Sequence, residues 1–225
     1  MDARDTIFTS IRRALGVTGH EAPRLEAVAA RLKSHPAGVI PARGNLVPRE
    51  RLALFRTMVE AAAGTVEELP GYDDVPAAVA AFLRAHNLPP TLRRGEDPRL
   101  AAINWERAPA LSVTVGRADG SELAAISHAF GGIAESGTLM LVSGKANPTT
   151  LNFLPDTHVV VVAAADVYGD YEALWQRLRA AYGAGQMPRT VNLITGPSRS
   201  ADIEQTLILG AHGPRRLHVF VVGAA

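Results

Sequence analysis

The run His158-Val159-Val160-Val161-Val162-Ala163 decides the fold class of this 225-residue chain. Near-continuous runs of β-branched residues are typical of strands in a parallel sheet that is buried on both faces. A helical pattern over 171–182 follows, and strands are predicted over 190–195 and 217–222 with a helix over 201–209 between them. Strands that alternate with helices indicate an α/β sandwich with a mostly parallel sheet.

The same alternation extends toward the N-terminus. An apolar run over 131–143 contains a turn that is marked by glycine. Before it, helices are expected over 48–63, 75–86 and 98–103, and strands over 65–69, 91–94 and 110–115.

A separate helical segment precedes this alternation. Ile7, Phe8, Ile11 and Leu15 fall on one helical face, a second helix is expected over 22–33, and Pro and Gly are frequent over 36–48. We therefore expect an N-terminal helical extension and linker over 1–47 and an α/β domain over 48–225. The first helix packs on its own domain or, as a scaffold, docks a partner.

The composition narrows the class of protein. Hydrophobic residues make up 47% of the chain, charged residues 20%, and the formal net charge is +1. These values favour a soluble globular protein and give no reason to expect binding to nucleic acid or to membranes. No run approaches the ~20 apolar residues of a membrane span, and the N-terminus lacks a signal-peptide pattern, so a cytoplasmic location is expected. The absence of cysteine excludes disulfides, thiolate-held zinc and iron–sulfur clusters within the chain.

The segment Gly196-Pro197-Ser198-Arg199-Ser200-Ala201-Asp202-Ile203-Glu204 follows a predicted strand and opens a predicted helix. The unpaired N–H groups and the dipole at a helix N-terminus favour an anion, and Arg199 adds a full positive charge. Ser200 suffices to cap the helix, so Ser198 and Arg199 are free to hold a carboxylate or a phosphate. The alternative is that the segment only starts a helix, and its two acidic residues weaken the positive field.

A second turn, Gly132-Ile133-Ala134-Glu135-Ser136-Gly137-Thr138-Leu139, lies in the apolar run. A buried carboxylate at Glu135 would serve as a general base or a nucleophile. Gly137 permits a close approach of the backbone. The alternative is that Glu135 pairs with an arginine or faces solvent. If the sheet is parallel, both turns are expected at or near the carboxyl ends of its strands, where ligands bind in open α/β sheets.

The seven histidines show no metal-binding pair such as H-E-x-x-H. His212 follows the last predicted helix and either polarises a ligand or hydrogen-bonds the turn, whereas His158 and His218 are expected to be structural. The chain also lacks a nucleophile elbow, a P-loop and a dinucleotide-binding fingerprint. We therefore expect neither a metal nor a cofactor in this chain.

Four motifs occur together between residues 133 and 219. They are IAESGTL at 133–139, the Leu154-Pro155 pair with His158, GPSRSADIE at 196–204, and GAHGP at 210–214 with Leu217-His218-Val219. In this order and spacing they closely resemble the LUD domain of the lactate-utilisation protein C (LutC/YkgG) family. The first half of the chain matches that family only in its general layout.

The resemblance implies a three-layer α/β/α sandwich like that of the NagB/RpiA/CoA-transferase group. It also implies a role in supporting the oxidation of L-lactate to pyruvate, together with partner proteins that hold the iron–sulfur clusters. The absence of cysteine fits a subunit without a cluster. The alternative is a stand-alone enzyme or binding protein for an acyl-CoA, a small carboxylate or a sugar phosphate.

This chain departs from the family pattern at a few positions. Family members usually have threonine where Ser136 and Ser200 stand here, and many have an arginine where this chain has Thr149 and Thr150, for which Lys145 is the candidate substitute. Glu135 is the candidate catalytic residue. The candidate residues for binding a small anionic ligand are Ser136, Gly137, Thr138, Gly196, Ser198, Arg199, Ser200, Asp202, His212 and Gly213.

Overall fold

The computed structural model describes residues 2–183, 185–200 and 208–223. The chain divides into two compact units, Met1–Val39 and Ile40–Ala225. The first unit holds α1 (Ala3–Leu15) and α2 (Ala22–Ser34), close to the helices that the sequence predicted. Gly16 ends α1 in the left-handed conformation, with a φ of 64°. Neither helix buries a residue, so the two helices form no core among the described residues of the first unit.

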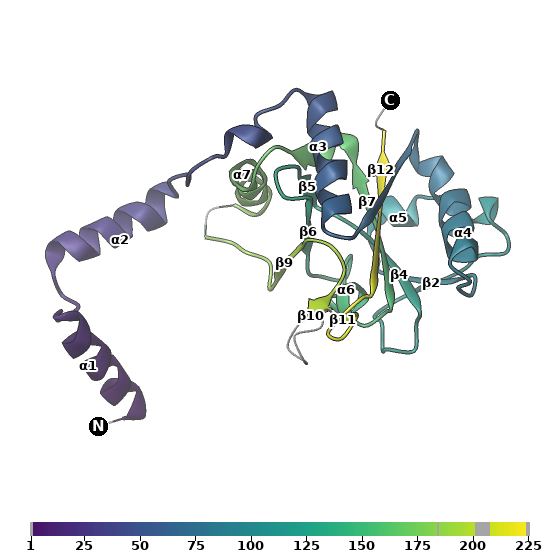
Figure 1. The fold of residues 1–225 in the computed structure, drawn as a ribbon. Helices are drawn as coiled ribbons and strands as arrows, with labels where there is room; N and C mark the ends of the chain where they lie inside the picture. Colours follow the sequence, from purple (N-terminus) through teal and green to yellow (C-terminus); the bar gives the residue numbers. More distant parts are fainter. Residues whose placement is uncertain (1, 184, 201–207, 224–225) are drawn as a thin grey trace. The chain divides into compact units, whose positions relative to one another are not determined.

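A six-stranded parallel sheet forms the centre of the second unit (Figure 1). Its strand order is β1-β12-β7-β4-β2-β3, so that β7 lies between β12 and β4. The strands are β1 (Thr65–Leu69), β2 (Thr91–Arg94), β3 (Ser112–Val115), β4 (Ala124–His128), β7 (Thr157–Ala163) and β12 (Arg216–Val222). This is the mostly parallel α/β sheet that the sequence predicted.

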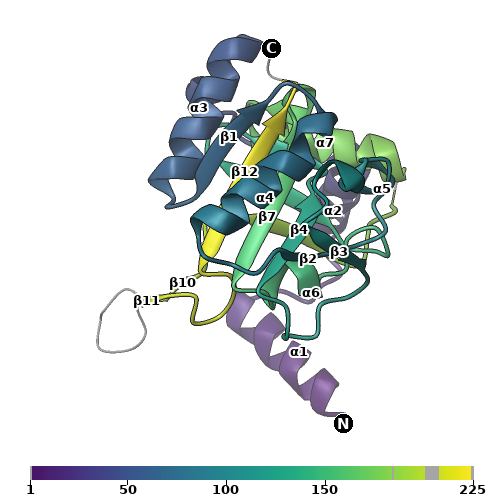
Figure 2. The same ribbon diagram turned by 90° about the vertical axis from the view of Figure 1, so that its right-hand side faces the viewer.

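The valines of β7 alternate between two cores. Val159 and Val161 pack on the face that is covered by α4 (Val75–Ala85) and α5 (Pro98–Ala101). Val160 and Val162 pack on the opposite face, against α3 (Pro48–Ala61). All four valines are completely buried, which explains why the strand is apolar on both of its faces from Val159 onward. Figure 2 shows α4 in front of the sheet.

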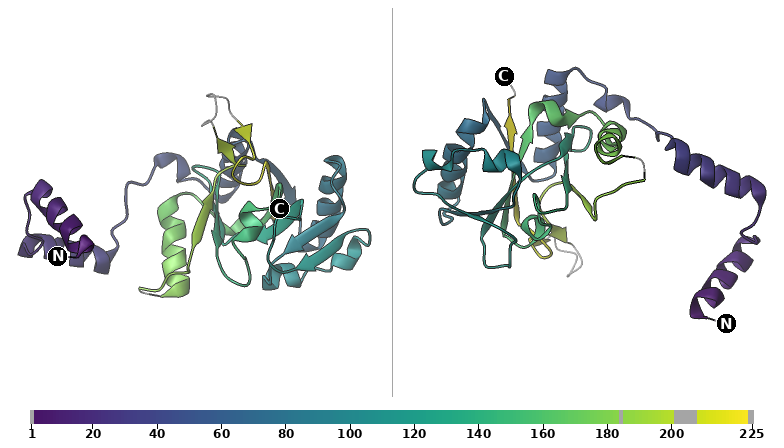
Figure 3. Two further views of the ribbon diagram at one scale, coloured as in Figure 1. Left: turned by 90° about the horizontal axis from the view of Figure 1, so that it is seen from below. Right: turned by 180° about the vertical axis from the view of Figure 1, so that it is seen from behind.

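A second, four-stranded sheet covers the α3 side of the main sheet. Leu139 and Leu141 of its strand β6 face the main sheet, whereas Met140 faces Leu174 and Leu178 of α7 (Tyr171–Tyr182). The views from below and behind place α7 and α4 on opposite sides of this unit (Figure 3). In the order β8-β5-β6-β9, the strands are β8 (Val167–Tyr168), β5 (Gly131–Ile133), β6 (Thr138–Val142) and β9 (Val191–Ile194).

This second sheet changes one expectation from the sequence. The strand predicted over 190–195 is β9, which pairs antiparallel with β6 instead of joining the parallel sheet. β5 and β6 form an antiparallel hairpin, and the turn predicted after Ile133 connects them. The helices and strands predicted between residues 48 and 115 are found nearly at their predicted bounds.

The helix predicted over 201–209 is wrong at its last two residues. Ile208–Leu209 forms strand β11, which pairs antiparallel with β10 (Arg199–Ser200). Ser200 is therefore a strand residue, and the helix that it was predicted to cap begins outside the described residues. The rest of the predicted helix, with Asp202 and Glu204, lies outside the described residues.

Short helical segments complete the second unit. Gly44 is buried and its backbone contacts that of Gly169, so part of the predicted linker packs within the α/β unit. Among the described residues, no helix has the length and apolar character needed to cross a membrane. The short segments are α6 (Thr150–Phe153), η1 (Ala42–Gly44), η2 (Tyr72–Asp74), η3 (Trp105–Arg107) and η4 (Ala164–Asp166).

Candidate functional site

A cavity of about 290 Å³ lies where β7 and β12 begin. His158 and Leu217, which are paired in register near the starts of these strands, form part of its wall. Asn152 and Phe153 of α6 line it as well, together with residues 193–199 and 212–214. The sequence predicted this turn at the carboxyl ends of the parallel strands, but the cavity lies at their amino ends, because the chain enters the turn from β9 of the second sheet.

Ser198 joins the two loops that close the cavity. Its N–H donates to the carbonyl of Pro214 at 2.8 Å, and its own carbonyl accepts from the N–H of Gly210 at 2.9 Å. Its hydroxyl Oγ accepts a longer bond, of 3.3 Å, from the N–H of His212. Gly196, with a φ of 76°, packs its backbone against the carbonyl of Ala62 at the end of α3. The turn is therefore held in place from both sides.

Three buried polar side chains form a line beside the cavity. The Ser127 hydroxyl donates to Oδ1 of Asn152 at 3.3 Å and lies 3.0 Å from Nε2 of His158. Since the single Ser127 proton is used toward Asn152, Nε2 of His158 carries the hydrogen and donates to Ser127. Within the described residues, Nδ1 of His158 and Nδ2 of Asn152 then have no hydrogen-bond partner. One buried acceptor and one buried donor are left unused.

Burial fixes the charge state of His158. The side chain is completely buried, and desolvation lowers its pKa to about 3. The imidazole is therefore neutral at pH 7. The inner wall of the cavity consequently offers neutral hydrogen-bonding groups and apolar side chains.

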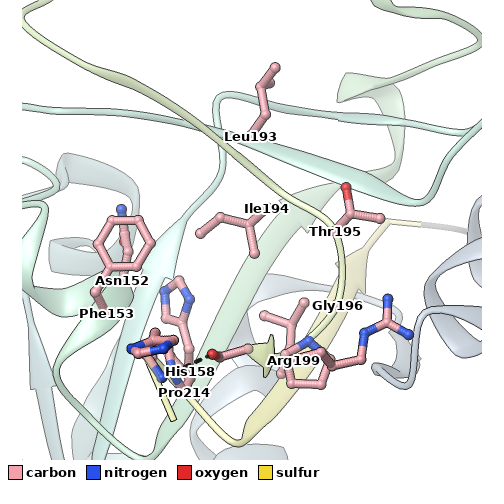
Figure 4. Close-up of a pocket in the computed structure, with 14 residues that line it drawn as sticks. Asn152, Phe153, His158, Leu193, Ile194, Thr195, Gly196, Arg199 and Pro214 are labelled. Carbon is pink, nitrogen blue, oxygen red and sulfur yellow. Dashed lines mark hydrogen bonds between the residues drawn. The ribbon is translucent and has the colours of Figure 1, made fainter. Parts of the chain in front are cut away.

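The charged candidates lie at the rim. Arg199 and His212 both line the cavity and are both exposed. Figure 4 shows Asn152 and His158 on one side and Arg199 beyond Gly196 on the other, with its guanidinium directed away from them. The structure thus brings Gly196, Ser198, Arg199, His212 and Gly213 to one cavity. The Arg199 guanidinium does not point toward the buried side chains of Asn152 and His158.

Glu135 lies outside the cavity lining. It is 4% exposed, and its Oε1 accepts a hydrogen bond of 3.1 Å from the N–H of Tyr171, at the start of α7. Its own N–H donates to the carbonyl of Gly169 at 3.0 Å. A carboxylate at this position complements the positive end of the helix dipole. The hairpin turn therefore places Glu135 in the interior, against α7.

The other residues of that turn are used in internal contacts. The hydroxyls of Ser136 and Thr138 lie 2.7 Å apart, and both contact the hydroxyl of Tyr171, at 3.1 and 2.9 Å. Gly137, with a φ of 65°, packs on the backbone of α3, where an added Cβ would lie 2.5 Å from the carbonyl carbon of Met58. Thr138 also lies 2.6 Å from Thr195, hydroxyl to hydroxyl, and this contact is a direct link between the two turns.

Sequence reasoning missed two groups. Asn152 precedes the Leu154-Pro155 motif, which was the only signal near it. The second group lies at the carboxyl end of β4, where His128 bonds the hydroxyl of Tyr72 through Nε2 at 2.8 Å and the carbonyl of Ala129 through Nδ1 at 2.8 Å. Burial lowers the pKa of His128 to about 4. Across the described ranges, no cluster of three or more His, Asp or Glu is placed to hold a metal ion.

Comparison with known proteins places these residues in a family. The family model described as the LUD domain matches residues 52–222, which contain the whole cavity lining. This chain belongs to the LUD domain family. A solved structure with a similar fold is the crystal structure of a DUF162 family protein from Deinococcus radiodurans, with a TM-score of 0.58 and 22% sequence identity. That alignment covers 79% of this chain and 99% of the neighbour.

The LUD domain also has curated relatives. A protein named lactate utilization protein C from Geobacillus sp. (strain WCH70) is 37% identical over 91 residues, which are 40% of this chain and 38% of the relative. A protein of the same name from Geobacillus kaustophilus (strain HTA426) is 34% identical over 154 residues, or 56% of this chain and 60% of the relative. In both cases this chain matches less than two thirds of the relative's length.

Proposed function

We propose that this LUD domain protein takes part in lactate utilisation, as a component without an iron–sulfur cluster that supports the oxidation of L-lactate to pyruvate. In this proposal, partner proteins hold the clusters. Family membership and the names of the relatives support the pathway. The chain has no cysteine with which to hold a cluster. The observation that carries the proposal is that residues of three sequence motifs, at 158, 196–199 and 212–214, line one cavity.

A genetic test addresses the pathway. Deletion of the gene should abolish or strongly slow growth on L-lactate and leave growth on glucose unchanged. Complementation with the wild type should restore growth, and tagged protein purified from lactate-grown cells should bring iron–sulfur proteins with it. Normal growth of the deletion strain on lactate, in a genome without a second copy of the gene, would overturn the proposal.

The cavity suggests what the protein binds. Nδ1 of His158 is an acceptor and Nδ2 of Asn152 is a donor, and both lack a partner in the described residues. A hydroxyl group has the matching chemistry for these two atoms, since it donates one hydrogen bond and accepts another. We infer that the cavity takes a small hydroxy carboxylate, whose carboxylate faces the rim that carries Arg199 and His212. Acyl-CoA esters and sugar phosphates are the alternative ligands.

A ligand panel tests the cavity directly. L-Lactate, pyruvate, a CoA ester and a sugar phosphate are compared by thermal shift. A ligand present at 100 times its Kd should stabilise the fold by about 2.7 kcal/mol. Asn152→Ala should abolish the shift, whereas Arg84→Ala, which removes an exposed arginine on α4, should leave it unchanged. A panel in which no compound shifts the melting temperature would contradict a small-molecule role for this cavity.

A further inference from the structure

A second hollow lies at the carboxyl ends of β2 and β3. It has a volume of about 500 Å³, and Glu96 and Gly116, which follow these two strands, form part of its wall. Thr149 and Thr150 line it as well. The short helix α6 therefore contributes its first residue to this hollow, and Asn152 and Phe153 to the cavity described above.

Three cationic side chains from three different loops line this hollow. Arg117 follows β3, Lys145 follows β6, and Arg189 precedes β9. All three are exposed, and none forms an ion pair within the part of the chain that the structure describes. Glu96 is the single carboxylate residue among those that line the hollow. We call this surface, formed by Arg117, Lys145 and Arg189, the cationic groove.

Hydrogen bonds fix the loops that carry these cations. Ser143 and Thr190 exchange two bonds, of 3.0 Å from N–H to carbonyl and of 2.9 Å from N–H to Oγ. The N–H of Glu96 donates to the carbonyl of Lys145 at 3.0 Å, next to a close contact between the backbones of Gly95 and Ala146. The cations therefore project from a backbone that needs little ordering when a ligand binds.

The wall has free hydrogen-bonding capacity besides its charge. The N–H of Ala118 donates to Oγ1 of Thr150 at 3.1 Å, which leaves the Thr150 hydroxyl proton available. Asn147, in the Lys145 loop, is 3% exposed, and neither atom of its side-chain amide has a partner in the described ranges. Buried amides without partners are rare in folded proteins. Asn147 lies outside the lining of the hollow, so the three cations and the Thr150 hydroxyl are the groups that the wall offers to a ligand.

We propose that the cationic groove is a second binding site, which takes a phosphate ester or a diphosphate. Three cations against one carboxylate suit a ligand with more than one negative charge. Arginine forks and a lysine ammonium are the groups that proteins use for phosphate oxygens. A monocarboxylate such as lactate carries one negative charge and suits the neutral wall of the other cavity better.

The test is calorimetric titration of the full-length protein with pyrophosphate and with inorganic phosphate at fixed ionic strength. Lys145→Ala and Arg189→Ala should each weaken pyrophosphate binding about tenfold or more, as expected for loss of one charge-assisted hydrogen bond. Glu96→Gln removes the single carboxylate and should tighten binding several-fold. Affinity should also fall as salt is raised, because the three cations are exposed.

Matched controls separate this site from general charge effects. Arg84→Ala removes one exposed positive charge away from the groove and should leave the affinity within about twofold of the wild type. Asn152→Ala should also bind pyrophosphate normally, since Asn152 lines the other cavity and does not line the groove. The proposal is overturned if the wild type does not bind pyrophosphate at millimolar concentration, or if Arg84→Ala weakens binding as much as Lys145→Ala does.

Discussion

The two turns of this protein that contain a glycine have similar backbone conformations but lie in different surroundings. Gly137 and Gly196 both have a positive φ, of 65° and 76°, and they pack on the backbone of α3 and of the residue that follows it, respectively. In the β5–β6 turn, the polar side chains of Glu135 and Thr138 are buried in internal contacts. The turn after β9 instead lines a cavity. We call the first the closed turn and the second the open turn.

A sequence motif that resembles a ligand-binding turn therefore does not by itself indicate a ligand site. Small residues, glycine and a carboxylate occur in the closed turn because a hairpin there must fit between α3 and the start of α7. In the open turn, glycine and small polar residues leave space beside a buried histidine and asparagine. The surroundings of a motif, and not its composition, separate these two cases.

The largest effect should come from a Cβ added to the closed turn. Gly137→Ala introduces a methyl group at a positive φ and against the backbone of Met58 and Val59, so α3 or the hairpin must move. We expect a loss of about 3 kcal/mol or more in the free energy of unfolding, measured by urea denaturation. Gly213→Ala is the matched control at the cavity, since its Cβ meets Ser198 Cβ at 3.4 Å without a positive φ. An equal loss in both variants would show that the open turn is packed as tightly as the closed one.

The second largest effect is on the free energy of unfolding at acid pH. Burial lowers the pKa of His158 from 6.5 to about 3, so the unfolded chain binds more protons than the folded one between these values. The stabilisation is complete above pH 6.5 and is lost as the pH falls, by about 1.4 kcal/mol per pH unit. His158→Gln should remove about this slope from the free energy of unfolding measured by urea denaturation between pH 6.5 and 4.5. Ser136→Ala, in the closed turn, should leave the slope unchanged.

Two further histidines should still make the free energy of unfolding of His158→Gln depend on pH. Burial also lowers the pKa values of His128 and His218, each to about 4. The wild-type slope should therefore be reduced by His158→Gln and not abolished. An unchanged slope would mean that His158 is not buried as a neutral group in solution.

The smallest effect distinguishes two roles for Glu135. Glu135→Ala leaves the N–H of Tyr171 without its acceptor and should cost about 2 kcal/mol of stability. Glu135→Gln keeps an oxygen at this place and should cost less than about 1 kcal/mol, a measure of the lost charge at the helix N-terminus. Both variants should keep the thermal shift caused by the cavity ligand. If Glu135→Gln is fully stable and yet inactive in lactate-dependent growth, Glu135 is the catalytic group that the sequence predicted.

The sequence predicted the main sheet well, because the pattern that indicates a buried parallel strand lies within one short run of residues. Val159, Val160, Val161 and Val162 are buried on alternate faces, and no other arrangement suits such a run so well. The second sheet was not predicted. The hairpin over 131–142 is apolar at most positions because both of its faces are covered, one by the main sheet and one by α7. Such a run does not reveal which sheet it joins.

The site was predicted in part, for a related reason. Ser198, Arg199 and His212 were named from their motifs and do line the cavity. The predicted edge of the sheet was wrong, because it depended on β9 being parallel, and strand direction is set by long-range pairing with β6. Asn152 was missed because its importance comes from burial and from an unused amide, neither of which is visible in a polar residue beside Leu-Pro.

The short helix α6 has one more consequence. It is four residues long, about one turn, and its residues line both hollows. A shift of this turn that widens one hollow changes the other at the same time. If occupancy of the cavity then alters the affinity of the cationic groove, thermodynamic linkage requires the groove's ligand to alter the cavity's affinity by the same factor.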